Sequence, residues 1–152
     1  MRKILLTNIL LVQIAVAFGS STNSLSEDTS LERCREMTRA VMQQVVAGND
    51  RGAFELLRPD LPIDKAQFEA LRDRTLEQRK AFAQKYGKIL GFKRVSEERV
   101  SDFLVRMTYV EKRANHVVRW QFTFYRGAAD WKLNTFIWDD DISKLFGHGP
   151  AS

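Results

Sequence analysis

The spacing of apolar residues along the chain changes near residue 89. Before that point apolar side chains recur every three or four positions, which is the period of a helix that buries one face. This spacing predicts a helix from about residue 28 to residue 47, a short second helix over 51–57 and a third over 64–86. The stripe of the first helix consists of Leu31, Cys34, Met37, Val41 and Val45. Gly48 and Gly87 follow the first and third helices and are typical helix stops.

After residue 89 apolar and polar residues alternate, which is the period of a strand with one buried face. The alternation predicts four strands, over 89–99, 102–113, 116–126 and 131–139. The links between them are short enough for antiparallel hairpins. Helices followed by a run of strands are typical of the α+β class. We therefore expect one domain over 27–146, in which three N-terminal helices pack on a curved four-stranded antiparallel sheet.

Burial of the apolar face of this sheet predicts which residues lie opposite one another. The predicted pairs are Val105–Phe122, Met107–Trp120, Phe103–Phe124, Phe124–Leu133, Trp120–Ile137 and Glu111–His116. One face of the sheet is then almost continuously apolar, and the three helices are the elements available to cover it.

The N-terminus has the pattern of a secretory signal peptide. Two basic residues, Arg2 and Lys3, precede an apolar run over 4–18, and small residues allow cleavage after Ala17 or Gly19. The run has about 15 residues, fewer than the roughly 20 that a membrane-spanning helix needs. An uncleaved anchor is the alternative.

These boundaries divide the chain into a signal peptide over 1–19, a disordered polar spacer over 20–26, the domain, and a flexible tail over 147–152. We expect the mature protein to be exported, either periplasmic or secreted, without a stable membrane anchor.

Charge and cysteine content exclude several functions. Removal of Arg2 and Lys3 leaves 22 basic against 19 acidic residues, and the two signs interleave, so a nucleic-acid-binding surface is not indicated. Cys34 is the one cysteine, which rules out an internal disulfide and leaves a buried core residue or an intermolecular disulfide. With two histidines and no ligand spacing, the sequence predicts neither a metal site nor a cofactor.

At this point the chain resembles a known superfamily. The order of three helices and four antiparallel strands, with the runs over 119–126 and 130–134, is similar to small exported bacterial members of the nuclear transport factor 2-like (cystatin-like cone) superfamily. The resemblance implies a cone-like fold over about 31–146. It does not choose a function, because such folds include isomerases, dehydratases and pure binding modules.

The predicted core face suggests binding rather than catalysis. A pocket there would be lined by Tyr109, Trp120, Phe122 and Thr135, which suit an apolar small molecule. That face carries no carboxylate or imidazole in mid-sheet to move a proton. We therefore expect a non-catalytic binding or interaction module. The alternative is an isomerase-like or dehydratase-like enzyme that uses the pair Glu111 and His116 at the mouth of the cone.

The opposite face of the sheet predicts a protein interface. It should carry Arg106, Arg119, Gln121, Phe136 and Trp138, and aromatic side chains with Arg are enriched at interfaces. The resemblance implies dimerisation through this face, so we expect a homodimer. The alternatives are a face open to solvent, or one covered by the C-terminal segment around 145–146.

The acidic run over 139–141 lacks the spacing of a calcium loop. We interpret it as the cap of a helical turn that begins near Ile142, because carboxylates stabilise helix N-termini.

Overall fold

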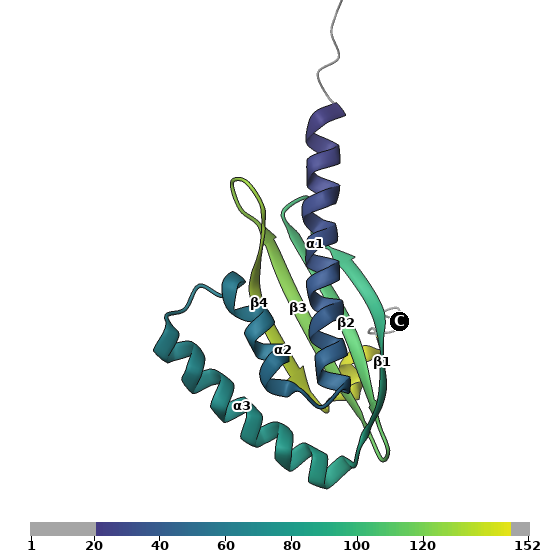
Figure 1. Cartoon of the computed structure of the whole chain (residues 1–152). Coiled ribbons are helices and arrows are strands. Elements are labelled where there is room, and N and C mark those ends of the chain that lie inside the picture. The colour runs from purple at the N-terminus through teal and green to yellow at the C-terminus, as the bar shows by residue number, and fades with distance from the viewer. Residues whose placement is uncertain (1–20, 147–152) are drawn as a thin grey trace, which may run out of the picture.

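The computed structural model describes residues 21–146 and the side chains from Thr29 onward. The elements in chain order are α1 (Ser21–Val46), α2 (Asp50–Leu57), the 3₁₀ turn η1 (Arg58–Asp60), α3 (Lys65–Tyr86), β1 (Ile89–Arg99), β2 (Leu104–Arg113), β3 (Val117–Arg126), β4 (Trp131–Asp139) and the 3₁₀ turn η2 (Ile142–Leu145). Three helices precede a four-stranded antiparallel sheet in the order β1-β2-β3-β4 (Figure 1), which confirms the α+β class. The predicted signal peptide and tail lie outside the described residues.

The helix boundaries agree with the sequence prediction except at the start of α1. This helix begins at Ser21, so the segment 21–26, which we expected to be a disordered spacer, is helical. Once a helix has formed, each added residue gains one backbone hydrogen bond. The packed part of α1 can therefore extend into a polar first turn that makes no apolar contacts of its own. None of the helices within 21–146 has the length and apolarity needed to cross a membrane.

Local capping fixes the ends of α2 and α3. The Asn49 side chain accepts a hydrogen bond from the Gly52 amide at 3.0 Å, and Asp64 and Gln67 form a reciprocal capping box at the start of α3. Gly87 ends α3 with φ +76°, a left-handed conformation that glycine adopts without a steric cost.

The hairpin between β2 and β3 turns one residue later than predicted. The Arg113 amide donates to the His116 carbonyl at 2.9 Å, so the chain reverses at residues 114–115. The register therefore differs by two residues from the predicted one: Met107 lies opposite Phe122, not Trp120, and Trp120 lies opposite Tyr109. The same side chains remain on the same face, because a shift of two residues preserves the alternation.

The register of β4 changes at a bulge. Phe124 lies opposite Leu133 as predicted, but Thr123 lies opposite Thr135, so Asn134 is an extra residue in β4. Beyond the bulge the alternation is inverted. Trp138, rather than Ile137, lies opposite Trp120.

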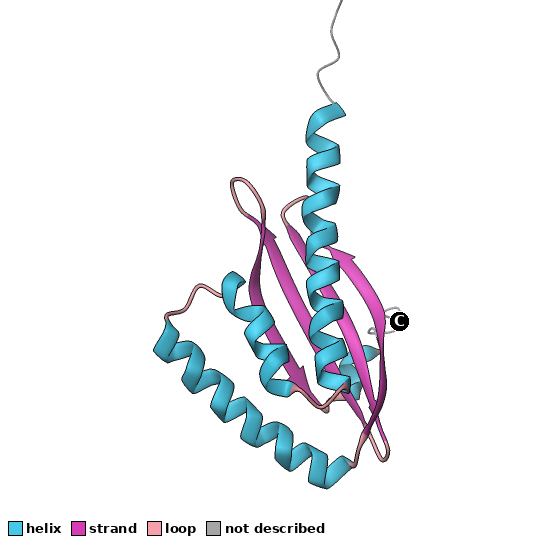
Figure 2. Ribbon diagram, in the orientation of Figure 1, coloured by secondary structure: helices cyan, strands magenta, loops and turns pink. Residues whose placement is uncertain are grey.

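Helices α1 and α2 cover one face of the sheet, which we call the inner face (Figure 2). The residues buried between them are Leu31, Cys34, Val41, Met42, Val45, Ala53, Phe54, Leu57 and Phe68 from the helices, and Val105, Met107, Tyr109, Val118, Trp120, Phe122, Phe124, Trp131 and Leu133 from the strands. Burial of each large apolar side chain contributes about 1.5–3 kcal/mol, so this layer is the main source of stability. The opposite side of the sheet is the outer face.

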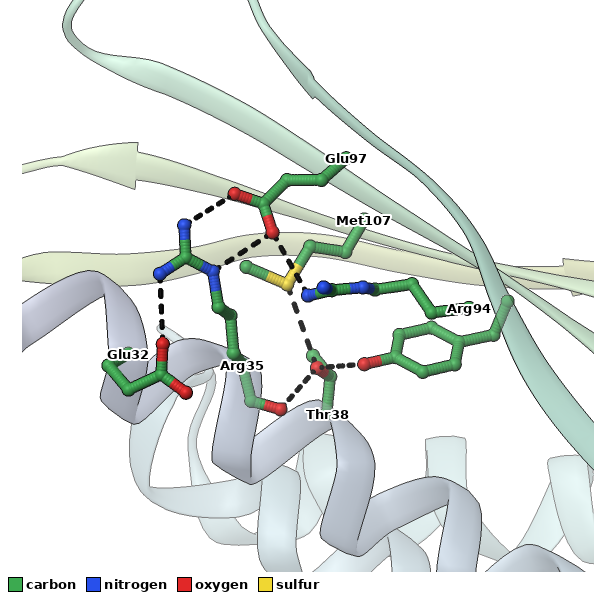
Figure 3. A network of polar contacts seen from close by, with 7 residues as sticks. Glu32, Arg35, Thr38, Arg94, Glu97 and Met107 are labelled. Atoms are coloured by element: carbon green, nitrogen blue, oxygen red, sulfur yellow. Dashed lines mark hydrogen bonds and ion pairs between the residues drawn. The ribbon is translucent and has the colours of Figure 1, made fainter. Parts of the chain in front are cut away.

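Polar contacts fix α1 against β1 and β2 (Figure 3). Arg35 donates to both carboxylate oxygens of Glu97, at 2.6 and 3.0 Å, and also to Glu32 at 2.9 Å. Deeper in the same contact, the Thr38 and Tyr109 hydroxyls lie 2.9 Å apart. A two-pronged guanidinium–carboxylate contact sets orientation as well as distance, so it locks the angle of α1 across the sheet.

Candidate functional site

The four side chains predicted to line an apolar pocket do not all meet. Tyr109, Trp120 and Phe122 point inward and are buried, with ring centroids 5.9 Å apart for Tyr109–Phe122 and 6.2 Å apart for Trp120–Phe122. Thr135 follows the bulge and is exposed, so the inversion of β4 removes it from this group. The three aromatic rings pack directly against one another and against the helices.

Glu111 extends the inner face to its end, because it continues the alternation of Val105, Met107 and Tyr109. Its side chain is completely buried. The inner face, which has no carboxylate in mid-sheet, therefore has a buried negative charge at its end. Arg79 of α3 donates to Glu111 at 2.8 and 3.3 Å, and the Trp120 indole N–H donates to Glu111 Oε2 at 2.8 Å.

Two further contacts complete this buried network. Arg113 Nε lies 2.6 Å from Glu111 Oε1, and Arg79 Nε donates to Asp50 Oδ1 at 3.1 Å. The Arg79 guanidinium also lies over the Trp120 ring at 5.0 Å and over the Trp138 ring at 5.4 Å. We call the set of Asp50, Arg79, Glu111 and Arg113 the interior charge network.

The network neutralises its own charges. Glu111 accepts three hydrogen bonds, two from Arg79 and one from the Trp120 indole, and the Arg113 guanidinium lies against its Oε1 as an ion pair. A general base needs a free lone pair within hydrogen-bond reach of its substrate. The contacts around Glu111 instead suit a buried ion pair that fixes α3 to the sheet.

The predicted pairing of Glu111 with His116 is wrong. Glu111 lies opposite Val118 in the sheet, because the hairpin turns at 114–115. The His116 ring stacks on Tyr86 at 4.4 Å, and its Nε2 lies 3.3 Å from the Asp140 carbonyl.

The carboxylate near His116 is that of Asp140, and it accepts a hydrogen bond from Tyr86. The Tyr86 hydroxyl donates to Asp140 Oδ2 at 2.5 Å and holds the pKa of Asp140 below its ordinary value. The next acidic residue, Asp141, accepts from the Ser143 amide at the start of η2, which confirms the predicted cap.

The residues predicted for the interface divide between the two faces. Arg106, Arg119 and Gln121 lie on the outer face, as predicted. Phe136 and Trp138 were predicted there, and that placement is wrong. The bulge at Asn134 turns them inward. The distance between ring centroids is 5.5 Å for Phe136–Phe54 and 4.9 Å for Trp138–Phe82. Arg119 lies opposite Asp139.

The outer face and η2 enclose a groove of about 990 Å³, which we call the outer groove. Its lining residues are Val95, Ser96, Glu98, Arg106, Thr108, Arg119, Gln121, Ile137, Asp141, Ser143, Lys144, Leu145 and Phe146. Three large apolar side chains stand exposed around it, with exposed fractions of 51% for Val95, 46% for Ile137 and 74% for Phe146. Val95 and Ile137 were not predicted on this face, and for Ile137 the reason is that the break in alternation at Asn134 and Thr135 was not recognised as a bulge.

The charges of the outer groove are paired. Arg106 donates to Glu98 at 2.6 Å and lowers the pKa of that carboxyl, and Arg119 donates to Asp139 at 2.5 Å. Lys144 lies 3.1 Å from Asp141. The groove therefore presents apolar surface between ion pairs that are already formed.

Among the described residues no three His, Cys, Asp or Glu side chains gather closely enough to hold a metal ion. Comparison of the chain with models of protein families, with curated proteins and with solved structures found no match.

Proposed function

We propose that this protein is an exported, non-catalytic interaction module of the nuclear transport factor 2-like superfamily that forms a homodimer through the outer face of its sheet. The observation that carries the proposal is the outer groove, where exposed apolar side chains lie among residues that sequence reasoning assigned to an interface.

The inner face supports the non-catalytic part of the proposal. Glu111 was the carboxylate of the enzymatic alternative, and it accepts hydrogen bonds from Arg79 and Trp120 and forms an ion pair with Arg113. His116, the other member of that pair, contacts Tyr86 instead. An acid–base mechanism would require both groups at one substrate. Binding of an apolar small molecule by Tyr109, Trp120 and Phe122 stays a prediction.

The exposed apolar residues of the outer groove support a protein partner. Val95 and Ile137 are about half exposed and Phe146 is three-quarters exposed, yet they lie around one groove rather than scattered singly. Contiguous exposed apolar surface rimmed by polar groups is typical of protein interaction sites. Arg106 and Gln121 supply that polar component.

The balance of charge favours a second copy of this chain as the partner. A two-fold dimer brings the same surface of each protomer together, so a strongly charged face would repel itself. In the outer groove Glu98 and Arg106 pair, and Lys144 pairs with Asp141. A nearly neutral surface with apolar side chains between ion pairs can meet its own copy without repulsion.

Export is part of the proposal because of the basic, apolar and small-residue pattern over 1–19.

Sedimentation of the purified protein over a range of concentrations tests the proposal. We expect a reversible monomer–dimer equilibrium. Ile137→Glu should raise the dimer dissociation constant at least about tenfold, since burial of an isoleucine side chain contributes roughly 1.5–3 kcal/mol and each dimer buries two copies.

Val100→Glu is the matched control. Val100 is 61% exposed in the β1–β2 loop and does not line the outer groove, so this variant should dimerise like the wild type. A wild-type protein that stays monomeric at every concentration, or equal weakening by both variants, would contradict the proposal.

A further inference from the structure

A second recess lies at the end of the molecule where α3 turns into β1. It has a volume of about 260 Å³. Its walls are the loop between α1 and α2, the C-terminal half of α3, and the facing ends of β1 and β2. The lining residues are Gly48, Asp50, Leu76, Arg79, Lys80, Ala83, Gly87, Lys88, Ile89 and Arg113. We call it the basic recess.

The recess has a net positive charge, because its two exposed lysines add to an interior charge network that is neutral by itself. Four of its lining side chains are Arg or Lys, and Asp50 is its single acidic one. Arg79 and Arg113 are almost completely buried, with exposed fractions of 1% and 3%, while Lys80 and Lys88 are exposed at the mouth. Even with the buried carboxylate of Glu111 behind Arg79, positive charges outnumber negative ones. Buried arginine and exposed lysine around one recess are the groups that recognise an anion.

Arg113 carries an incompletely bonded donor at this place. Its Nη1 donates to the Gly87 carbonyl at 3.1 Å. Its Nε lies 2.6 Å from Glu111 Oε1, but its N–H has no hydrogen-bond partner in a suitable direction. The Arg113 N–H is thus ion-paired with Glu111 but not aligned with it, so a ligand oxygen in the direction of this N–H would complete its hydrogen bonding.

The rest of the recess tells what kind of anion fits. Leu76, Ala83 and Ile89 form an apolar wall. The space in front of Gly48 is open, because a Cβ built on this glycine would meet nothing within 4 Å. Such a wall suits a short hydrocarbon chain better than a phosphate, which is polar on every side.

The C-terminal carbonyls of α3 could oppose an anion, but they already accept hydrogen bonds. The Ala83 carbonyl accepts from Gly87, the Tyr86 carbonyl accepts from Asn115, and the Gly87 carbonyl accepts from Arg113. Their partial negative charge is therefore offset within the protein.

We propose that the basic recess binds a short aliphatic carboxylate, with its charged group between Arg113 and the two lysines and its chain against Leu76 and Ile89. The basic recess shares no lining residue with the outer groove, so binding there does not depend on dimerisation.

Titration of the ¹⁵N-labelled full chain with sodium butyrate at constant ionic strength tests the proposal. The backbone amides of Gly48 and Gly87, which line the recess, should shift and saturate. Butyramide has the same shape without the charge and should shift them little. Inorganic phosphate should bind more weakly than butyrate, because it cannot use the apolar wall.

Lys80→Glu and Lys88→Glu keep the buried arginines intact, since both lysines are exposed. Each reversal should weaken butyrate binding about fivefold, given that an exposed ion pair contributes roughly 0.2–1 kcal/mol and a reversal counts twice. Lys65→Glu, at the other end of α3, is the matched control and should leave binding unchanged. Equal shifts with butyrate and butyramide, tighter binding of phosphate, or insensitivity to both recess variants would overturn the proposal.

Discussion

Substitution of Glu111 tests whether the interior charge network serves stability. In Glu111→Gln the volume is kept and the amide oxygen can still accept from the Trp120 indole. What disappears is the negative charge that faces Arg79 and Arg113, both of which remain buried. The variant therefore isolates the electrostatic contribution.

The expected loss is large because all three groups are out of solvent. The side chains of Arg79 and Glu111 are both 0% exposed, and that of Arg113 is 2% exposed. Removing one partner of a buried ion pair costs about 3–5 kcal/mol, since it leaves an uncompensated buried charge. Typical domains have a free energy of unfolding of about 5–15 kcal/mol, so Glu111→Gln should lose at least about a fifth of the stability.

Urea unfolding followed by tryptophan fluorescence measures this loss, because Trp120 is part of the network. Glu98→Gln is the control. Its carboxylate also pairs with an arginine but is 48% exposed, so it should lose about 1 kcal/mol or less. The double variant Glu111→Gln/Arg79→Met should lose less than the sum of the single variants. If the free energy of unfolding of Glu111→Gln lies within about 1 kcal/mol of the wild-type value, the network does not act as a structural ion pair.

Two further predictions concern Glu97 and Cys34. The hydrogen bond from Arg35 lowers the pKa of Glu97 from its ordinary value of 4.5, so the stability from this pair is complete above that value and is lost as the pH falls through the lower folded-state pKa. Glu97→Gln should therefore flatten the acid limb of the unfolding free energy measured by urea titration, and an unchanged acid limb would contradict the assignment. Burial raises the pKa of the Cys34 thiol to about 11, so iodoacetamide should alkylate it far more slowly in the native protein than in urea, as followed by mass spectrometry. Equal rates in both conditions would show that the thiol is accessible.

The fold class followed from the sequence because the two periodicities do not overlap. Apolar residues at helical spacing end before Gly87, and strict alternation is strong in β2 and β3. The pairing of Phe124 with Leu133 was predicted for the same reason. Burial of one face determines which side of each strand is inside, even where the exact register is missed.

The bulge in β4 was missed although the sequence carries a signal of it. The large apolar residues fall at 131 and 133 and then at 136 and 138, and the two consecutive polar residues Asn134 and Thr135 interrupt the alternation. One inserted residue inverts every later side chain, which moved Phe136 and Trp138 to the inner face and Ile137 to the outer face.

The interior charge network was missed for a different reason. Arg79 was given no role in the sequence analysis, although it falls on the buried stripe with Phe68, Thr75 and Phe82. That spacing was the available signal. The partner of Arg79 is Glu111, 32 residues away, and such a pairing depends on tertiary packing that local spacing does not contain.

The central claim is that the outer face of one copy meets the outer face of another, and an intermolecular nuclear Overhauser measurement on a mixture of labelled and unlabelled protein tests it most directly. The account predicts intermolecular contacts from the methyl groups of Val95 and Ile137, and none from Val100 or Leu90, which do not line the outer groove. Intermolecular contacts from Val100 or Leu90 alone, or none from Ile137 in a sample that is dimeric by sedimentation, would contradict it.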